Sequence, residues 1–321
     1  MPSPPTQAKI GVVLVNWNTA RLTKDCVDSL QRGTRVPDVI VVVDNNSASE
    51  DRAVLDALPG VKVIHLDRNT GFTGANNVGI RHLLEEACDL IWILNNDTVV
   101  DTACLERLTR HLAEHPETGV VTGKIFFADP PDVIWFAGGF FRRLTLTARH
   151  RGAYEKDAPQ YEVPARSDFI TGCCMLVRAD VWRRVGEFHP AFFAYSEDSE
   201  WCLRARAAGV RCMIEPAAKL WHRVGASLLF REKTPSETAT HLLVRNAIYV
   251  IRLHAAWWQR PFALVAMLRN MGRTVVKAPA ARRSEVARSV WRAVREGFRD
   301  ALIDVDARGG AESEEEIPRA P

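Results

Sequence analysis

Four segments within the first hundred residues repeat one pattern, and no other feature constrains the fold as strongly. Each is a short run rich in Val, Ile and Leu that ends in polar or glycine residues and is followed by a stretch with helical spacing. The runs are KIGVVLVNWN, DVIVVVDNNS, VKVIHLDRNTG and DLIWILNND. This alternation predicts buried parallel strands in a doubly wound α/β sheet, whose ligands bind beyond the carboxyl ends of the strands. All four polar tips are expected at that edge.

Helical spacing also predicts the segments that connect these strands. Helices are expected over roughly residues 20–33, 49–58, 74–87 and 101–115. The expected N-caps are Ser47 or Ser49 and Asp101, because Ser and Asp side chains accept hydrogen bonds from free amide groups.

The pattern changes after residue 118. Short alternating strands and Gly-Gly turns there predict an antiparallel or mixed extension of the sheet. DFITGCCMLVRADVWRRVGEF is typical of a strand followed by a helix, and AYSEDSEWCLRARAAGV predicts a helix from about Ser196 to Gly209. Beyond WHRVGAS the chain is expected to be helical to about residue 303.

Composition excludes some classes of protein. A chain of 321 residues with 47 % hydrophobic residues can bury an ordinary core as one large or two modest domains. A net charge of +3 gives no reason to expect nucleic-acid binding. Seven cysteines, an odd number with no CxxC spacing, favour a reduced, cytoplasmic compartment. Neither a signal peptide nor a spanning helix is expected, since the longest apolar stretch is broken by Arg252, His254, Arg260 and Pro261.

The polar tips of the strands are the first candidates for a binding site. Side-chain amides and carboxylates at the sheet edge suit the donor and acceptor groups of a nucleobase and a ribose. At any one tip, the Asn and Asp residues could serve only to form the turn, but four such tips together favour a ligand. The residues are Asn16, Trp17 and Asn18; Asp44, Asn45 and Asn46; Asn69, Gly71 and Phe72; and Asn95, Asn96 and Asp97.

The glycine-rich stretch NTGFTGANNVG follows the third run. Its glycines at 71, 74 and 79 do not form GxGxxG, and the motif does not follow the first strand, so a dinucleotide-binding dehydrogenase is disfavoured. We interpret these glycines as allowing the backbone to approach a ligand, with Asn76 and Asn77 at the start of a helix.

Asp97 is the only carboxylate at its strand tip, and a bound diphosphate would need a divalent cation to offset its charge. One carboxylate would hold such an ion poorly. His222 in LWHRVGAS is the candidate second ligand, provided that the fold brings it near Asp97; a structural role for a lone histidine is the alternative.

YSEDSEWC places three acids, Glu197, Asp198 and Glu200, at the expected start of a helix. Acids favour helix N-termini because of the helix dipole alone. The same dipole keeps a carboxylate ionised, as a general base acting on a hydroxyl requires. Both interpretations remain open from the residues themselves.

Taken in order along the chain, these motifs resemble an inverting glycosyltransferase of family 2. The series is VVLVNWN, VVVDNNS, NTGFTGANNVG, LNND, TGCCMLVRADVWRRVGEF, FAYSEDSEWCLRARAAG, HRVGAS and the pair Arg245 and Asn246. It covers roughly residues 9–250. The resemblance implies a GT-A fold, and within the family the chain looks most like the rhamnosyltransferase branch that builds bacterial surface polysaccharides.

The resemblance also implies roles for single residues. Asp44 would bind the nucleobase, and Asn95, Asn96 and Asp97 would stand where the family has its DxD motif. Asn95 departs from the first Asp of that motif and would meet the ribose. The nucleotide-sugar site would then comprise Asn16, Asn18, Asp44, Asn69, Gly71, Asn76, Asn95 and Asn96.

The remaining implied roles concern the metal and the chemistry. Asp97 and His222, the latter in the family's HxxGxS pattern, would hold Mg²⁺ or Mn²⁺. Asp198 would deprotonate the acceptor hydroxyl while Glu197 positions it. The implied donor is dTDP-L-rhamnose or a UDP-sugar, and the implied acceptor is a saccharide or a lipid-linked saccharide.

The expected organisation follows from the same comparison. Residues 1–8 would be a disordered lead, 9–240 the GT-A domain, 241–305 a C-terminal helical region and 306–321 a disordered acidic tail. The helical region mixes Trp, Phe and Leu with many Arg, so it could pack on the domain, form a homodimer or lie peripherally on the inner face of the cell membrane.

Two other functions are weighed against this one. A sugar-nucleotide nucleotidyltransferase would need a glycine-rich N-terminal loop followed by Arg and Lys, which the sequence lacks. A non-catalytic carbohydrate-binding or scaffold protein of the same fold would not need Asp44, Asp97, Asp198 and His222 together.

Overall fold

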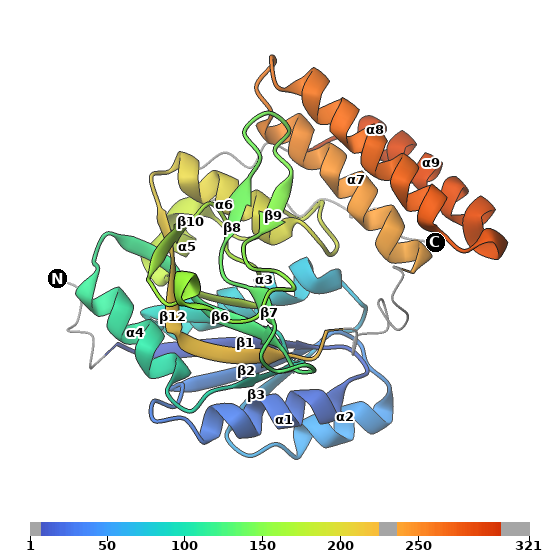
Figure 1. Ribbon diagram of the computed structural model, residues 1–321. Coiled ribbons are helices and arrows are strands. Elements are labelled where there is room, and N and C mark those ends of the chain that lie inside the picture. The colour runs from blue at the N-terminus through green and yellow to red at the C-terminus, as the bar shows by residue number, and fades with distance from the viewer. Residues whose placement is uncertain (1–7, 225–235, 303–321) are drawn as a thin grey trace.

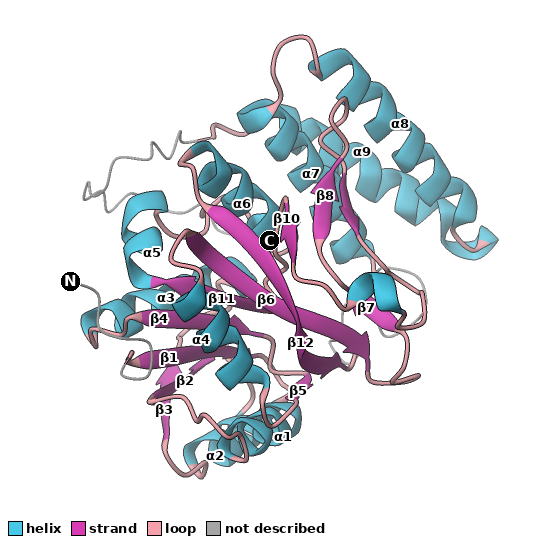
Figure 2. Ribbon diagram, turned by 60° about the vertical axis from the view of Figure 1, so that its left-hand side comes forward, coloured by secondary structure: helices cyan, strands magenta, loops and turns pink. Residues whose placement is uncertain are grey.

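The computed structural model describes residues 8–224 and 236–302, which form a mixed β-sheet between helices and a helical C-terminal part (Figures 1 and 2). The strands are β1 (Ile10–Asn16), β2 (Val39–Asp44), β3 (Val61–His65), β4 (Leu90–Leu94), β5 (Thr98–Val100), β6 (Thr118–Phe127), β7 (Ile134–Phe136), β8 (Gly139–Phe141), β9 (Ala148–His150), β10 (Ala165–Ser167), β11 (Cys174–Arg178) and β12 (Arg211–His222). The helices are α1 (Ala20–Gln31), α2 (Ser49–Asp56), α3 (Gly71–Glu85), α4 (Cys104–Glu114), α5 (Ala179–Val185), α6 (Glu197–Ala207), α7 (Glu237–His254), α8 (Arg260–Lys277) and α9 (Arg283–Arg299).

The main sheet has the order β10-β12-β6-β11-β4-β1-β2-β3, with β5 paired to β12 and β7 to β6. Strands β4, β1, β2 and β3 are mutually parallel, whereas β11 runs antiparallel to both β4 and β6. The predicted parallel α/β sheet with a mixed extension is therefore confirmed. Right-handed crossovers explain the layers (Figure 1). Strands β2 and β3 are added on one side of β1, so α1 and α2 lie on one face of the sheet. Strand β4 is added on the other side of β1, so α3, which precedes it, lies on the opposite face.

The edge position of β3 corrects one expectation. The VKVIHLDRNTG run was expected to be a buried strand like the other three, but its residues are half-buried or exposed. Strands β1, β2 and β4 have neighbours on both sides and are almost entirely buried. Because β3 pairs only with β2 in the described sheet, its Val and Ile side chains keep part of their surface in solvent.

The predicted helices form, but the predicted N-caps are wrong. Helix α2 is capped at Ala48 and α4 at Ala103, and neither cap residue provides a side-chain hydrogen bond. Ser47 is used elsewhere, because its hydroxyl accepts the Asn18 amide proton and the Asn16 side-chain amide. Asp101 accepts a hydrogen bond from the Ala103 amide in the turn before α4, which delays the helix by three residues. Helix α3 begins earlier than predicted, at Gly71.

The expected C-terminal helices are present as α7, α8 and α9, which form a core of their own around Ile248, Met267 and Val290 (Figure 1). Helix α7 also packs on the sheet-bearing part, where Tyr249 and Val250 contact Phe192. The domain boundary between residues 240 and 241 stays a prediction, and in the structure α7 contributes to both cores. The predicted lead and acidic tail lie outside the described residues, apart from Ala8. Within the described ranges, no helix is long and apolar enough to cross a membrane.

Helix α7 also holds the turn that precedes α6. Tyr195 and Ser196 have φ angles of +70° and +67°, in the left-handed region that non-glycine residues adopt at a cost. The fully buried Asn246 donates from Nδ2 to the carbonyl oxygens of Ala194 at 2.8 Å and Tyr195 at 2.6 Å. Arg245 donates in turn to the Asn246 side-chain oxygen. This pair thus fixes the backbone that delivers Glu197 and Asp198.

We predict that Asn246→Asp lowers the free energy of unfolding by at least about 1–3 kcal/mol, because a carboxylate cannot donate to the two carbonyl oxygens and would be buried against them. Asn270→Asp, the same change at an exposed position of α8, is the control. Urea unfolding followed by circular dichroism measures both. Equal midpoints for the two variants would show that Asn246 does not hold this turn.

Candidate active site

The carboxyl ends of β1, β2 and β4 meet at one edge of the sheet, as parallel pairing requires. Asn16 and Asp44 are paired in register at the ends of β1 and β2, and His65 pairs with Asp44 from β3. Asn95, Asn96 and Asp97 follow β4 directly. The fold therefore brings the predicted polar tips to the same edge.

Asn16 and Asp44 are both fully buried and bonded to other protein groups. The Asn16 side chain donates to Ser47 Oγ at 3.0 Å and accepts from Thr23 Oγ1 at 2.8 Å. Asp44 forms ion pairs of 3.0 Å with Arg52 and with His65. Both side chains support the edge of the site from within the protein.

The charge of Asp44 is stabilised by these neighbours. Burial alone would raise the pKa of this carboxyl, but hydrogen bonds from His65, Ser47 and Asn16 outweigh burial, and the pKa is lowered. The hydrogen bond with Asp44 in turn raises the pKa of His65, with a second contribution from Asp56. Asp44 is therefore a fixed negative charge below the site surface.

Asn18 and Asn69 occupy turns next to this network. Asn18 has φ +53°, and its side-chain oxygen accepts the Ala48 amide proton at 2.8 Å. Asn69 accepts from the Gly71 amide at 2.8 Å and from the Asn45 side chain at 2.9 Å. Trp17, beside Asn18, is 38 % exposed and presents an aromatic surface at this edge.

Two glycines of the third motif are needed for protein packing, and their role in the approach of a ligand stays a prediction. Gly71 has φ +76°, and a Cβ built there would lie 2.1 Å from the Phe193 carbonyl oxygen. Gly79 similarly makes room for Val13. Asn76 lies within α3, not at its start, and its buried side chain donates to the Phe72 carbonyl oxygen.

At the fourth tip, the two asparagines have different environments. Asn96 donates to the hydroxyls of Thr19 and Thr23, both at 2.8 Å, and so ties the tip to α1. The Asn95 side-chain oxygen is buried and has no hydrogen-bond partner among the described residues. Such an oxygen is costly to leave unpaired, and it is available to a ligand.

The fold brings Asp97 and His222 together, as the sequence argument required. Strand β12 pairs antiparallel with β5, so His222 lies opposite Thr98, and His222 Nε2 is 3.1 Å from Asp97 Oδ1. Within the described part of the chain, neither Asp97 Oδ1 nor His222 Nδ1 has a hydrogen-bond partner. The short approach is thus a contact between polar atoms without hydrogen-bond geometry. Both side chains are almost completely buried.

This arrangement fits a divalent cation. Two ligand atoms at right angles around an ion with bonds of about 2.1 Å would lie about 3.0 Å apart, close to the observed separation. In residues 8–224 and 236–302, no cluster of three His, Cys, Asp or Glu side chains could hold a metal. Asp97 and His222 would then supply two ligands to such an ion, and a bound molecule or water would have to fill the other positions.

A short loop before β11 connects this pair to Asp198. The Gly172 amide donates to Asp198 Oδ2 at 2.9 Å, and the carbonyl oxygen of the next residue, Cys173, accepts the Asn95 amide proton at 3.0 Å. The loop thus fixes the position of Asp198 relative to the fourth tip. The residues TGCC belong to one of the motifs that carry the family resemblance. The sequence does not show that they link Asp198 to the fourth tip; the structure does.

Asp198 and Glu197 differ in their electrostatic state. Asp198 accepts hydrogen bonds from the Gly172 amide and from the Ser199 amide and hydroxyl, which leaves carboxylate lone pairs for one further donor. Glu197 is buried, and its Oε2 has no hydrogen-bond partner in the described structure. Burial, and then the charge of Asp198, raise the pKa of Glu197 well above its ordinary value.

Two aromatic residues beside His222 were not found from the sequence. The Trp135 ring packs edge-on against His222 with 4.7 Å between ring centres, and His150 packs against Trp135 at 5.0 Å. Burial lowers the pKa of His150, which keeps its ring neutral. Trp135 lies in β7 and His150 in β9, and no spacing rule links either residue to His222.

Comparison with known proteins identifies the family of this chain. The family model described as "Glycosyltransferase like family 2" matches residues 5–251. The dTDP-rhamnosyl transferase RfbF of Shigella flexneri is 25 % identical over 218 residues, covering 66 % of this chain and 70 % of that protein. An N-acetylglucosaminyl-diphospho-decaprenol L-rhamnosyltransferase of Mycobacterium tuberculosis is 24 % identical over 278 residues, covering 78 % and 86 %. This chain spans only 18 % of another relative, the O-antigen biosynthesis protein RfbC of Myxococcus xanthus.

Solved structures show the same fold at low sequence identity. GalNAc-T7 with UDP, GalNAc and Mn²⁺ aligns with a TM-score of 0.60 at 15 % identity, over 89 % of this chain and 55 % of that one. The mannosyltransferase PcManGT of Pyrobaculum calidifontis, in complex with GDP-Man and Mn²⁺, aligns with a TM-score of 0.56 at 14 % identity, over 93 % and 89 %. With a GT-A fold and a family match over most of its length, the chain belongs to glycosyltransferase family 2.

Proposed function

We propose that the protein is an inverting, metal-dependent glycosyltransferase that moves a sugar from a nucleoside diphosphate to a saccharide acceptor in cell-surface polysaccharide or glycolipid synthesis. One observation carries the proposal: Asp97 and His222 face each other at 3.1 Å, while Asp198 is tied to the same tip through Gly172 and Cys173. A cation site and an available carboxylate at one sheet edge are what diphosphate departure and hydroxyl attack require.

On the donor side, we assign the nucleobase to the first two tips and the ribose to the fourth. Asp44 would support the nucleobase pocket from beneath, because its buried carboxylate is bonded to protein groups, with Asn16 next to it and Asn18 at the surface. The unpaired oxygen of Asn95 would accept a ribose hydroxyl, while Asn96 holds the tip. Asn69, Gly71 and Asn76 would support the donor pocket through the third turn. The relatives' names support dTDP-L-rhamnose or a UDP-sugar as the donor to test.

Asp97 and His222 would hold the cation, Mg²⁺ or Mn²⁺. Bound there, it would offset the negative charge that develops on the departing diphosphate. An imidazole is a softer ligand than Mg²⁺ prefers, which favours Mn²⁺. The Trp135 ring against His222 would fix the orientation of the imidazole and keep water from one side of it.

On the acceptor side, Asp198 would take the proton of the attacking hydroxyl. Three hydrogen bonds orient its carboxylate, and the N-terminus of α6 favours its negative charge. Glu197, with its raised pKa, would remain protonated and donate a hydrogen bond to the acceptor. A single in-line displacement with this base inverts the configuration at the anomeric carbon.

We predict that UDP or dTDP raises the thermal stability of the protein only when Mn²⁺ is present. A ligand at about 100 times its Kd adds about 2.7 kcal/mol to the free energy of unfolding. Thermal melts with UDP, dTDP, GDP and NAD, each with and without Mn²⁺, measure this effect. Asp97→Ala should abolish the metal-dependent shift, and Asp180→Ala, at an exposed position of α5, should keep it. A shift with NAD alone, or an equal shift with and without metal, would contradict the proposal.

We predict opposite outcomes for two neutral substitutions at the acceptor site. Asp198→Asn should lower turnover of the donor by a factor of about 10²–10⁴, because it removes the base. Glu197→Gln should stay within about tenfold of the wild type, because an amide resembles a protonated carboxyl. Donor hydrolysis and transfer rates measure both, with donor-induced thermal shifts as the check on folding. Unchanged turnover in Asp198→Asn would remove it as the base.

We also propose that the enzyme works in the cytoplasm at the inner face of the membrane. All seven cysteines are buried free thiols, as suits a reduced compartment. Residues 256–299 contain ten Arg or Lys and two Glu, a charge of +8 in a chain of net charge +3. The exposed face of α8 is nevertheless apolar, with Phe262, Val265 and Leu268 each more than half exposed. Apolar side chains among basic ones are typical of helices that lie on anionic bilayers.

We predict that the protein floats with vesicles containing phosphatidylglycerol but not with pure phosphatidylcholine, and that added salt weakens this binding. The double change Val265→Glu and Leu268→Glu should abolish flotation. A homodimer interface is the alternative role of this face, and light scattering on the wild type and the same variant tests it. If the variant changes from a dimer to a monomer but still floats, this face forms a homodimer instead.

A further inference from the structure

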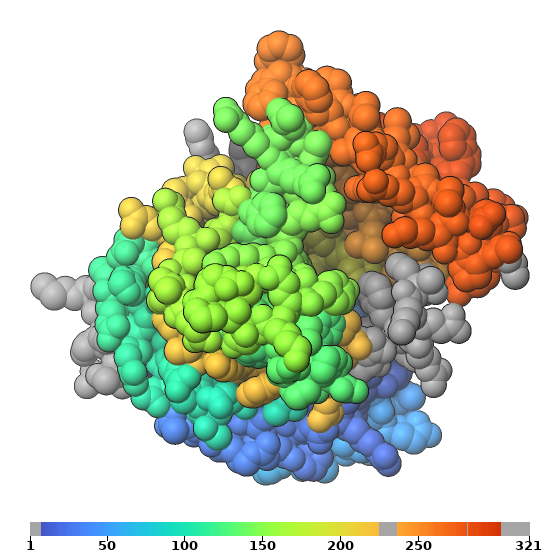
Figure 3. Space-filling model, in the orientation of Figure 1, coloured from blue at the N-terminus to red at the C-terminus, as the bar shows by residue number. Residues whose placement is uncertain are grey.

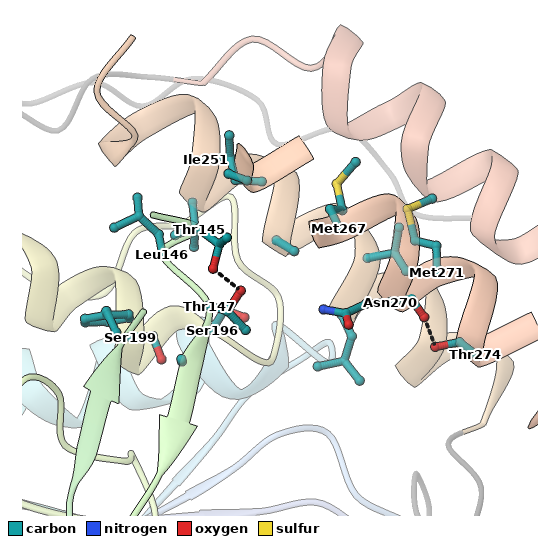
Figure 4. Close-up of a pocket in the computed structure, with 17 residues that line it drawn as sticks. Thr145, Leu146, Thr147, Ser196, Ser199, Ile251, Met267, Asn270, Met271 and Thr274 are labelled. Atoms are coloured by element: carbon teal, nitrogen blue, oxygen red, sulfur yellow. Dashed lines mark hydrogen bonds between the residues drawn. The ribbon is translucent and has the colours of Figure 1, made fainter. Parts of the chain in front are cut away.

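An apolar cavity lies between the C-terminal helices and the β8–β9 hairpin, beside the start of α6. Figure 4 shows its lining, with Leu146 from the hairpin, Ile251 from α7 and Met267 from α8 converging on one space. Its volume is about 240 Å³. In Figure 3 the surface is hollowed between the green segment that includes the hairpin and the orange C-terminal helices.

The lining of the cavity contrasts with its surroundings. No Asp, Glu, Lys, Arg or His lines it among the described residues, although the adjacent helices are strongly basic. Its polar groups are hydroxyls and one amide, and two of the hydroxyls, on Thr145 and Thr147, already bond each other at 2.9 Å. A cavity with this lining suits an uncharged, apolar group.

The cavity adjoins the proposed base directly. Ser196 and Ser199, which line it, flank Glu197 and Asp198 in the chain. The Ser199 hydroxyl is also 3.1 Å from Asp198 Oδ1 and bonds to it. A molecule that filled the cavity would therefore lie next to the place where the acceptor hydroxyl must sit.

The size of the cavity limits what it can hold. Apolar cavities of about 150 Å³ bind benzene, whereas pockets that enclose a whole drug-sized ligand measure about 300–1,000 Å³. At about 240 Å³, this cavity fits a short length of hydrocarbon and not a complete lipid. The rest of a longer chain would have to continue outside it.

Helix α8 provides a surface for that continuation. Ala263, Met267 and Met271 line the cavity on one side of the helix, while Phe262 and Val265 are exposed on another. A helix that is apolar on two sides is expected to have apolar surroundings on both. Among the described residues, the protein provides apolar surroundings for α8 on the cavity side only.

We infer that this cavity binds the first part of the hydrocarbon chain of a lipid-linked acceptor, with the sugar of that acceptor presented to Asp198. The inference rests on the proposed function and adds the class of acceptor: an amphiphile whose chain begins close to the reacting sugar. A relative whose name specifies a diphospho-decaprenol acceptor belongs to the same family.

The test compares two acceptors that differ only in their chain. These are the decyl and methyl esters of N-acetylglucosaminyl diphosphate, assayed with dTDP-L-rhamnose and, in parallel, with the donor selected by the thermal melts. For the wild type, the KM of the decyl ester should be at least about tenfold lower, which corresponds to the burial of about two methylene groups.

A substitution that fills the cavity supplies the second arm. Ala247→Phe on α7 places a ring in the cavity and should bring the KM of the decyl ester to that of the methyl ester, while donor hydrolysis is unchanged. Ala287→Phe on the exposed side of α9, the same chemical change, should retain the preference. Thr147→Phe fills the cavity from the hairpin and is the second variant if Ala247→Phe does not fold.

Thermal stabilisation by each ester, measured without donor, keeps the test independent of turnover. Stabilisation by the decyl ester that exceeds that by the methyl ester, and that the filled variants lose, supports the inference even when the head group is not a substrate. Equal effects of both esters, or a chain preference that survives both filled variants, would overturn it. Absence of nucleotide binding and of donor hydrolysis would instead overturn the proposed function.

Discussion

The antiparallel pairing of β12 with β5 is the interaction on which the rest of the site depends. Strand β12 begins at Arg211 and ends at His222, which pairs with Thr98, the residue after Asp97. The Arg223 amide extends the pairing by donating to the Asp97 carbonyl oxygen at 2.9 Å. Because backbone bonds on both sides of His222 fix its position, the 3.1 Å approach of two buried polar side chains does not depend on their own mutual attraction.

The buried network beneath the first two tips has a similar function at the nucleotide end. Asp44 is saturated by Arg52, His65, Ser47 and Asn16, and these partners come from α2, β3, the turn after β2, and β1. Such a network costs free energy if any member is missing, but when complete it makes the edge rigid. A site built on rigid elements loses little conformational entropy when it binds a donor. Because this loss is one of the costs that reduce binding affinity, a rigid edge favours binding.

The sequence predicted the fold well wherever one local pattern was enough. Alternation of apolar runs and helices located β1, β2 and β4, because strands with two neighbours must be apolar on both faces. It also located β3, but it did not predict the partial exposure of this strand, because a run such as VKVIH does not indicate that the strand lies at an edge. The caps failed because Ser47 and Asp101 could bond several amides, and tertiary contacts decided which.

For the site, the sequence identified residues at the ends of regular strands and at a helix start. It could not identify Trp135 and His150, because their link to His222 is spatial. Strand β7, which carries Trp135, pairs with β6, and β6 pairs with β12, which is far from β7 in the chain. Nor could it distinguish Glu197 from Asp198 electrostatically. The two differ because the Gly172 amide reaches one of them and no described group reaches Oε2 of the other.

Helix α7 connects these observations. One part of it, at Asn246, holds the strained turn before Glu197, while Val244, Ala247 and Ile251 on the same helix line the apolar cavity. A chain bound in the cavity would pack against the helix that positions the turn, so acceptor binding and the placement of Asp198 would be coupled through a single rigid element.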